Sequence, residues 1–334
     1  MIKLYDKYDR RHNYLRISLT DKCNFNCYYC NPSLNCNKSL RKNEILDYEE
    51  ISRLITIFTN NGFSKIRLTG GEPFARKNII NLFDKIKIIK ENADFPFELS
   101  ITTNGSLIKE HINVLKSKGL DRINFSLDSL NREIFKKITG SNNLDIVIEN
   151  INAAKKAGFE NIKINTVILK GINDKEIGDF CEFALQNELT IRFIEYMPIG
   201  QNGWNNDLLL SSDDIKRIVK ENYYLKEFGY HKGVARNYHI NDGIAQVGFI
   251  SPITNNFCSG CNRLRITSDG KLKLCLFEEE SKSMNILNLL RDNTITDNAI
   301  IEAVNAHLYS KNFERKPLEE LLMIDNDKMI NIGG

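Results

Sequence analysis

Two groups of closely spaced cysteines are the residues of this sequence best suited to chemistry. They are Cys23, Cys27 and Cys30, and Cys258, Cys261 and Cys275. Close cysteines often indicate structural zinc, but such a site needs four ligands and each group offers three. Three thiolates suit a [4Fe–4S] cluster with one iron open to a non-protein ligand. The spacing favours a cluster for the first group and leaves cluster and zinc equally open for the second.

Two further cysteines complete the set of eight. Cys36 follows the first group in a polar loop, and as a fourth ligand it would be the main alternative to an open iron. Cys181 lies in a stretch with helical periodicity, where a buried cysteine acts as a small apolar residue. We assign no other role to either residue.

Short β-rich runs alternate with amphipathic runs between residues 14 and 197. The predicted strands are Tyr14–Thr20, Lys65–Gly70, Glu98–Thr103, Arg122–Leu127, Asn161–Ile168 and Thr190–Met197. The predicted helices are Tyr48–Asn61, Lys77–Glu91, Leu107–Lys118, Asn143–Ala157 and Asp174–Gln186. Strands separated by helices imply right-handed βαβ units and a parallel sheet.

The strand periodicity decides between an open sheet and a barrel. One face of the first five strands is apolar and the other is polar. A parallel sheet with helices on both faces would show nearly continuous apolar strands instead. We therefore predict an α/β fold, an incomplete TIM-like (β/α)6 barrel with a polar interior, over residues 1–235. A smaller C-terminal α+β region, residues 236–334, is expected to close the open side and to carry the second cysteine group.

The predicted interior is basic. Its cations are Arg16, Lys65, Arg67 and Lys163, with Arg192 nearby on the sixth strand. Buried charges without partners are costly, and Asp128 is the clearest carboxylate on these faces. Several converging cations suit a polyphosphate better than a single carboxylate.

Three shorter motifs accompany the cysteines and the basic face. Gly70-Gly71-Glu72-Pro73 ends the second strand, where glycines let the backbone approach a ligand and Glu72 could accept hydrogen bonds from an amine. Arg263 and Arg265 follow Cys261 at alternate positions, either facing a shared cavity or pointing outward. The chain ends in Gly333-Gly334, which could fray or thread into a cavity.

Composition excludes several classes of protein. The chain has 334 residues, and this length suggests about two domains. Its net charge is +3, with 42% hydrophobic and 27% charged residues. The charge balance argues against a nucleic-acid binder. No apolar run approaches the roughly 18 residues of a membrane span, and the charged N-terminus lacks a signal peptide. We expect a cytoplasmic protein without disulfides.

The combined motifs resemble the radical S-adenosylmethionine (SAM) superfamily. Over nearly the whole chain they resemble its GTP 3′,8-cyclase family, lyases that begin molybdenum cofactor biosynthesis. Besides the cysteines and Gly70–Pro73, the tracts that carry the resemblance are Tyr14–Thr20, Thr102–Gly105, Asn124–Asp128, Arg192–Met197, Phe257–Arg265, Asp269–Lys271, Cys275–Phe277 and Gly333-Gly334.

The resemblance implies two [4Fe–4S] clusters, SAM as a cofactor and GTP as the substrate. It implies that Cys23, Cys27 and Cys30 hold the SAM cluster, that Tyr29, Gly71, Ser126 and Met197 line the SAM site, and that Cys258, Cys261 and Cys275 hold a second cluster that binds guanine. The implied GTP contacts are Arg16, Arg67, Thr102, Lys163, Arg263 and Arg265, with Lys65 and Arg192 as helpers.

The implied reaction gives (8S)-3′,8-cyclo-7,8-dihydroguanosine 5′-triphosphate, after a deoxyadenosyl radical from SAM takes hydrogen from C3′ of GTP. It needs a reductant such as ferredoxin or flavodoxin, and the chain could act as a monomer or a homodimer. The sequence departs from the family at Asp9, where glycine is typical, at Asn31, and in an acidic stretch at residues 325–329. The alternatives are a peptide-modifying radical SAM enzyme and a zinc-stabilised binding protein.

Overall fold

Twelve strands of the described residues form one curved sheet. The computed structural model describes residues 2–30, 40–228, 233–324 and 327–333. Its strands are β1 (Tyr14–Ser18), β2 (Lys65–Thr69), β3 (Glu98–Thr103), β4 (Arg122–Ser126), β5 (Lys163–Ile168), β6 (Thr190–Glu195), β7 (Leu225–Glu227), β8 (Arg236–Ile240), β9 (Gln246–Ile250), β10 (Arg263–Ile266), β11 (Lys271–Lys273) and β12 (Met284–Asn285). All six predicted strands are confirmed, with ends shifted by at most two residues.

Helices follow most of the parallel strands. They are α1 (Tyr48–Asn60), α2 (Ile79–Asn92), α3 (Ile112–Ser117), α4 (Arg132–Thr139), α5 (Leu144–Lys156), α6 (Ile177–Asn187), α7 (Ser212–Asn222), α8 (Ile286–Arg291), α9 (Asp297–Leu308), α10 (Leu318–Leu321) and α11 (Met329–Ile332). The five predicted helices are confirmed, although α3 is shorter than expected because a 3₁₀ turn precedes it. The sequence prediction missed α4.

Local sequence explains why these elements form. In α1, the Asp47 side chain accepts a hydrogen bond from the N–H of Glu50, and the Glu50 carboxylate accepts one from the N–H of Asp47. This capping box satisfies two donors at the helix N-terminus. Ile51, Leu54 and Phe58 then recur on one face and are fully buried. Among the described helices, none is long and apolar enough to cross a membrane.

The parallel strands form an incomplete barrel, as predicted. The strand order is β12-β11-β10-β1-β2-β3-β4-β5-β6-β9-β8-β7, with β10 and β9 pairing parallel to β1 and β6. The C-terminal part of the chain therefore extends the sheet at both edges, because β1 and β6 would otherwise expose unpaired backbone groups. One sheet thus crosses the predicted boundary at residues 235–236, and the division into two domains remains a prediction.

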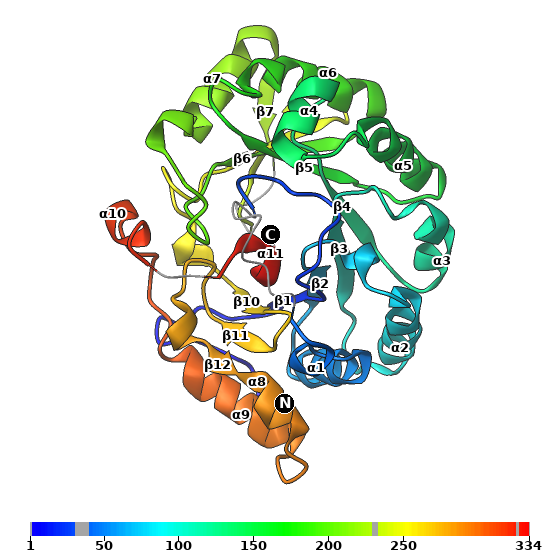
Figure 1. Cartoon of the computed structure of the whole chain (residues 1–334), viewed down its shortest axis with the longest axis vertical. Coiled ribbons are helices and arrows are strands. Elements are labelled where there is room, and N and C mark those ends of the chain that lie inside the picture. Colours follow the sequence, from blue (N-terminus) through cyan, green and yellow to red (C-terminus); the bar gives the residue numbers. More distant parts are fainter. Residues whose placement is uncertain (1, 31–39, 229–232, 325–326, 334) are drawn as a thin grey trace.

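The two faces of the sheet differ as the alternation predicts. Leu15, Ile17 and Ile66 are fully buried on the face that packs against the helices. Figure 1 shows α1 to α6 outside the ring of strands and α11, near the C-terminus, inside it. The polar residues of the strands therefore face an enclosed interior.

Candidate functional site

The first triad, Cys23, Cys27 and Cys30, lies in the loop that follows β1. All three thiols are free and half-buried. The Sγ of Cys23 accepts a hydrogen bond from the N–H of Phe25 at 3.4 Å and a contact from Nδ2 of Asn104 at 3.8 Å. The loop therefore sits at the carboxyl end of the parallel strands, where barrels carry their functional groups.

Gly70 and Gly71 bring the end of β2 against this loop. Gly70 has φ +137°, and a Cβ there would lie 2.7 Å from the carbonyl O of Thr20. A Cβ on Gly71 would lie 2.3 Å from the carbonyl O of Lys22. Only glycine permits this approach. We expected the glycines to approach a ligand, but the close approach in the structure is to the cysteine loop itself.

Glu72 ties the same corner together. Its Oε1 accepts hydrogen bonds from the N–H of Phe74 and the hydroxyl of Thr103, and its Oε2 accepts one from the N–H of Asn104. The side chain is fully buried, and burial raises the pKa of Glu72 to about 7. Glu72 therefore has a structural role at this corner, and its role as an amine acceptor remains a prediction.

A second buried carboxylate stands beside the first triad. Tyr29 donates its hydroxyl to Oδ2 of Asp128 at 2.6 Å, and Oδ1 of Asp128 accepts from the N–H of Val167. Burial raises the pKa of Asp128 to about 6, and burial also raises the pKa of Cys30 to about 12, with Cys23 and Asp128 adding to the shift. The sequence had suggested Asp128 as a partner for the interior cations. In the structure its carboxylate instead bonds to Tyr29 and to the backbone of Val167.

The interior of the barrel holds a cavity of about 280 Å³. Nine basic side chains of the described residues line it, against one carboxylate, Glu98. They are Arg16, Lys65, Arg67, Arg122, Lys163, Arg192, Arg263, Arg265 and Arg315. Arg315 donates to the backbone carbonyls of Pro252 and Ile253, and Glu98 pairs with Arg122 at 2.9 Å. The remaining positive charge suits an anionic ligand.

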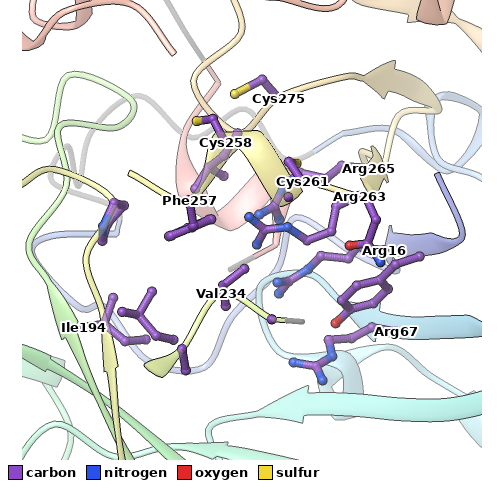
Figure 2. Close-up of a pocket in the computed structure, with 18 of the residues that line it drawn as sticks. Arg16, Arg67, Ile194, Val234, Phe257, Cys258, Cys261, Arg263, Arg265 and Cys275 are labelled. Atoms are coloured by element: carbon purple, nitrogen blue, oxygen red, sulfur yellow. The ribbon is translucent and has the colours of Figure 1, made fainter. Parts of the chain in front are cut away.

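The strand register places three of these arginines side by side. Arg16 lies directly opposite Arg265 on β10 and opposite Arg67 on β2. Like charges directly opposite each other destabilise a sheet. In Figure 2, Arg16, Arg67 and Arg263 extend into the same space. Cys258, Cys261 and Cys275 lie above them in this view. A row that costs stability in the free protein points to a bound anion.

Burial among like charges changes the basicity of the cavity. Burial, with the charges of Arg192 and Arg122 adding to it, lowers the pKa of Lys163 to about 7. Burial also lowers the pKa of Arg192 to about 10 and that of Arg265 to about 10, with Arg67 and Arg263 respectively as the next cause. An anion in the cavity would relieve these shifts, because it favours the charged forms.

Further polar groups face the barrel interior without a partner. Among the described residues, Thr102 Oγ1, Asn165 Oδ1 and both polar atoms of the Asn124 side chain are buried and make no hydrogen bond. Asn124 lies between Thr102 and Lys163 in the register. Buried groups of this kind usually have partners, so they indicate a site that a ligand completes.

The remaining predicted SAM residues lie near this layer. Ser126 is opposite Asn165 in the register, at the end of β4, and Met197 lines the cavity. Thr102 is not among the described residues that line the cavity. It lies opposite Asn124, on the sheet face that is directed toward the barrel interior. The structure thus places the predicted GTP residues and Met197 in the barrel interior, whereas Tyr29 and Gly71 lie on loops that follow β1 and β2.

The sequence prediction missed several side chains that line the cavity, among them Tyr14, Glu98 and Arg122. Each is the first residue of a strand and lies on the same face as the residue two positions later, which was predicted to face the interior. The signal was therefore present in the strand periodicity. It was overlooked because the polar face of these strands was assigned only from Arg16, Ser100 and Asn124 onward, although the predicted strands begin two residues earlier.

The second triad, Cys258, Cys261 and Cys275, lines the same cavity. Cys258 opens a 3₁₀ turn, Cys258–Gly260, and Cys275 follows the antiparallel pair of β10 and β11. Burial alone would raise the pKa of Cys261, but the positive charges of Lys311 and Arg263 lower it to about 6. The structure places Arg263 and Arg265 inside the cavity rather than facing outward.

The C-terminal segment enters the barrel. The carbonyl O of Gly333 accepts a hydrogen bond from Arg265 at 3.2 Å, and a Cβ on Gly333 would overlap the side chain of Thr69. Lys273 and Asp327 form a buried ion pair at 2.6 Å that anchors this segment. Gly334, Asn31 and Cys36 lie outside the described residues.

The donor sets of both triads fit iron–sulfur clusters. Each supplies three free thiols, and soft thiolates are ligands that such clusters prefer. No three His, Cys, Asp or Glu side chains of the described ranges gather closely enough to hold a single metal ion. A cluster of four irons and four sulfides is larger than one ion and needs its thiols further apart.

Two family models match the chain. The Radical SAM superfamily matches residues 17–184, and the Molybdenum Cofactor Synthesis C family matches residues 189–317. The first covers the triad that follows β1, and the second covers Cys258, Cys261 and Cys275.

Relatives match over most of the chain. A GTP 3′,8-cyclase of Thermodesulfovibrio yellowstonii is 39% identical over 96% of this chain and 99% of its own length. GTP 3′,8-cyclase 2 of Pseudomonas aeruginosa is 40% identical over 96% of both chains. Molybdenum cofactor biosynthesis protein 1 of Dictyostelium discoideum is 38% identical over 99% of this chain, which spans 52% of that longer protein.

Solved structures share the fold. Streptococcus suis SuiB bound to S-adenosylmethionine has a TM-score of 0.61 at 17% identity, over 86% of this chain and 66% of its own. SuiB bound to the precursor peptide SuiA has a TM-score of 0.62, also at 17% identity, over 92% and 67%. At this identity the likeness shows the fold alone.

Proposed function

The chain belongs to the radical SAM superfamily and, within it, to the GTP 3′,8-cyclase family, and we propose that it converts GTP to (8S)-3′,8-cyclo-7,8-dihydroguanosine 5′-triphosphate. It is a radical SAM enzyme of molybdenum cofactor biosynthesis that uses SAM and an iron–sulfur cluster. The observation that carries the choice of substrate is the basic cavity, because its row of arginines lies directly beside three thiols.

We assign one [4Fe–4S] cluster to each triad. The first triad would hold the cluster that binds SAM, with Tyr29, Gly71, Ser126 and Met197 around the cofactor. The second would hold a cluster whose open iron takes the guanine. When bound, these groups supply the electron and the radical chemistry. The protein residues bind and orient the substrate and exclude water.

The basic residues position GTP. Arg16, Arg67 and Arg265 share one level of the barrel and would hold the triphosphate by paired, charge-assisted hydrogen bonds. Lys163 lies one level higher, opposite Asn124, and Thr102 flanks Asn124 on the other side. Arg263, with Lys65 at the entrance, would complete the pocket. Fixing the nucleotide at several points turns a bimolecular encounter into a positioned reaction.

We propose that the C-terminal segment that includes Gly333 closes the barrel at the substrate; Gly334, the other glycine of the predicted tail, lies outside the described residues. Gly333 already accepts a hydrogen bond from Arg265, one of the proposed GTP contacts. A reductant such as ferredoxin or flavodoxin would supply the electron, and the enzyme would act as a monomer or a homodimer.

The test is turnover by the reconstituted protein. The chain is loaded anaerobically with iron and sulfide, then mixed with SAM, a reductant and GTP deuterated at C3′. We expect a new isomer of GTP, together with 5′-deoxyadenosine that carries the deuterium. Deoxyadenosine without loss of GTP would contradict the substrate, and failure to bind any cluster would contradict the enzyme assignment. Cys181→Ser is the control, because Cys181 is buried in α6 away from both triads.

A further inference from the structure

The side chain of Lys311 lies buried against the thiol of Cys261. Lys311 follows α9 and is 5% exposed. Its Nζ is 3.5 Å from Sγ of Cys261, 3.0 Å from the carbonyl O of Arg263 and 2.9 Å from Nε2 of His12. An ammonium group has three N–H donors and no acceptor. These three contacts therefore use its full donor capacity.

His12 fixes the direction in which Lys311 points. His12 is 1% exposed, and its Nδ1 is 2.9 Å from the carbonyl O of Arg10. Because the ammonium can only donate, Nε2 of His12 accepts, and Nδ1 carries the ring proton and donates to Arg10. The ring is thus held at both nitrogens, so the Lys311 side chain has little freedom to turn away from Cys261.

Arg10 braces the other part of the second triad. Its NH1 donates to the carbonyl O of Cys258 at 2.7 Å, its NH2 donates to that of Asn312 at 2.8 Å, and its Nε pairs with Asp6 at 2.7 Å. The preceding residue, Asp9, has φ +57°, a left-handed conformation that suits the glycine typical of the family. Residues 6–12 and 311–313 therefore form a supporting shell around the second triad.

This shell is separate from the substrate cavity. Among the described residues that line the cavity, Asp6, Arg10, His12 and Lys311 do not appear. A buried lysine is costly unless its charge has a partner. Of the three partners of Lys311, only Cys261 becomes an anion when it binds a metal, since the thiolate is the ligand. The lysine charge is therefore placed where it acts on that sulfur.

We propose that Lys311 is a positioning residue for the second cluster, which holds Cys261 in place as a ligand and raises the reduction potential of the cluster. The inference rests on the proposed function, because it takes the second triad to bind a [4Fe–4S] cluster. Hydrogen bonds to the sulfurs and net charge are among the properties that set cluster potentials. A positive charge favours the reduced cluster, which is the more negative state.

The test uses a chain that can load only the second triad. In a Cys23→Ser, Cys27→Ser, Cys30→Ser background, we compare Lys311→Met, Lys311→Arg and Lys316→Met. Lys316 is the control, because it forms an ion pair with Glu279 at the surface. The readouts are the midpoint potential, followed by the electron paramagnetic resonance signal, and the rate of iron release to a ferrous chelator. Neither needs SAM or GTP.

We expect Lys311→Met to lower the potential and to release iron at least about tenfold faster. Loss of a residue that supports a metal ligand commonly weakens metal binding by this factor. Lys311→Arg should restore both values toward those of the background, and Lys316→Met should change neither. Should Lys311→Met fail to fold, Lys311→Gln replaces it. Gln keeps N–H donors without the charge, so it should retain the iron and still lower the potential.

Unchanged potential and release rate in Lys311→Met, or in Lys311→Gln where that is used, would overturn the inference. Equal changes in Lys316→Met would overturn it as well, because the effect would then be a general one of surface charge. If the background chain binds no cluster, the second cluster of the proposed function fails together with this inference. A background chain that binds its cluster but shows no change of potential or iron release in the Lys311 variant rejects the inference alone.

Discussion

Each triad offers three thiols, but the charged groups beside the two triads have opposite signs. Beside the first, burial raises the pKa of Cys23 to about 11 and that of Cys30 to about 12, and the carboxylates of Glu72 and Asp128 add to the respective shifts. Beside the second, the charges of Lys311 and Arg263 outweigh burial at Cys261 and lower its pKa to about 6. At Cys275 burial still raises the pKa, although Lys311 acts against it.

The difference matches the charges of the proposed ligands. SAM carries a sulfonium and an ammonium group, so carboxylates near the first triad suit it. GTP carries a triphosphate, so the cations near the second triad suit it. Complementary and repulsive charges together give specificity. If the proposed function holds, charge would direct SAM to the first triad and GTP to the second within one barrel.

The strongest test of the comparison removes one thiol from each triad. Cys27→Ser and Cys261→Ser should each lower the iron content from about eight to about four per chain. Cys27→Ser should abolish SAM cleavage. Cys261→Ser should leave SAM cleavage but abolish cyclisation of GTP. Iron analysis and deoxyadenosine assays measure both, and loss of SAM cleavage in both variants would contradict the division of roles.

Removal of two cations should separate the ligands almost as clearly. Arg263→Ala combined with Arg265→Ala should weaken GTP binding at least about a hundredfold, because each charge-assisted contact contributes roughly 1.5–3 kcal/mol. SAM binding and the iron content of the first triad should stay unchanged. Arg132→Ala is the control, since Arg132 pairs with Asp145 at the surface. Equal affinity for GTP in the double variant and the wild type would exclude these arginines from the site.

The pH dependence of GTP binding should report Lys163. Its pKa in the free protein is lowered to about 7 by burial first and by neighbouring arginines next. Bound triphosphate favours the charged amine, so the pKa rises on binding and a proton is taken up. Between pH 7.5 and 9 the affinity should therefore fall with rising pH, by up to about tenfold per unit.

Lys163→Arg is the matched variant for this measurement. Arginine stays charged throughout the window, so affinity should become nearly independent of pH. Equilibrium binding under anaerobic conditions measures both proteins. The same slope in the wild type and in Lys163→Arg would assign the titration to another group.

A smaller effect should distinguish two adjacent tyrosines beside the first triad. Tyr29→Phe removes the hydroxyl that donates to Asp128 and leaves a buried carboxylate oxygen without that donor, at a cost of about 1–3 kcal/mol. Tyr28→Phe should cost little, because the Tyr28 hydroxyl is buried without a hydrogen-bond partner among the described residues. Thermal unfolding and SAM affinity should both rank Tyr29→Phe below Tyr28→Phe, and the reverse order would contradict the assignment.

Much of the barrel and its basic interior could be predicted from sequence. Strand periodicity is local, so Arg16, Arg67 and Lys163 could be assigned to one face before any contact was known. The cysteine spacings are equally local. The extension of the sheet by β9 and β10 was missed, because the C-terminal region was interpreted through its cysteines rather than its strands.

The shell around the second triad could not be predicted in this way. Lys311 and His12 are 299 positions apart and meet only after the N-terminal segment packs beside the residues that follow α9. No spacing rule relates a lone lysine to a distant cysteine. Asp128 shows the same limit, because its partner Tyr29 lies on the loop of the first triad rather than among the cations.

The most direct test of the central claim asks which cluster senses which ligand. One variant carries serine at Cys23, Cys27 and Cys30, and the other carries serine at Cys258, Cys261 and Cys275. Each is reduced anaerobically, and its electron paramagnetic resonance spectrum is recorded with GTP and with SAM. The account predicts that GTP alone changes the spectrum of the second cluster and SAM alone changes that of the first. A response of the first cluster to GTP, or of the second to SAM, would contradict it.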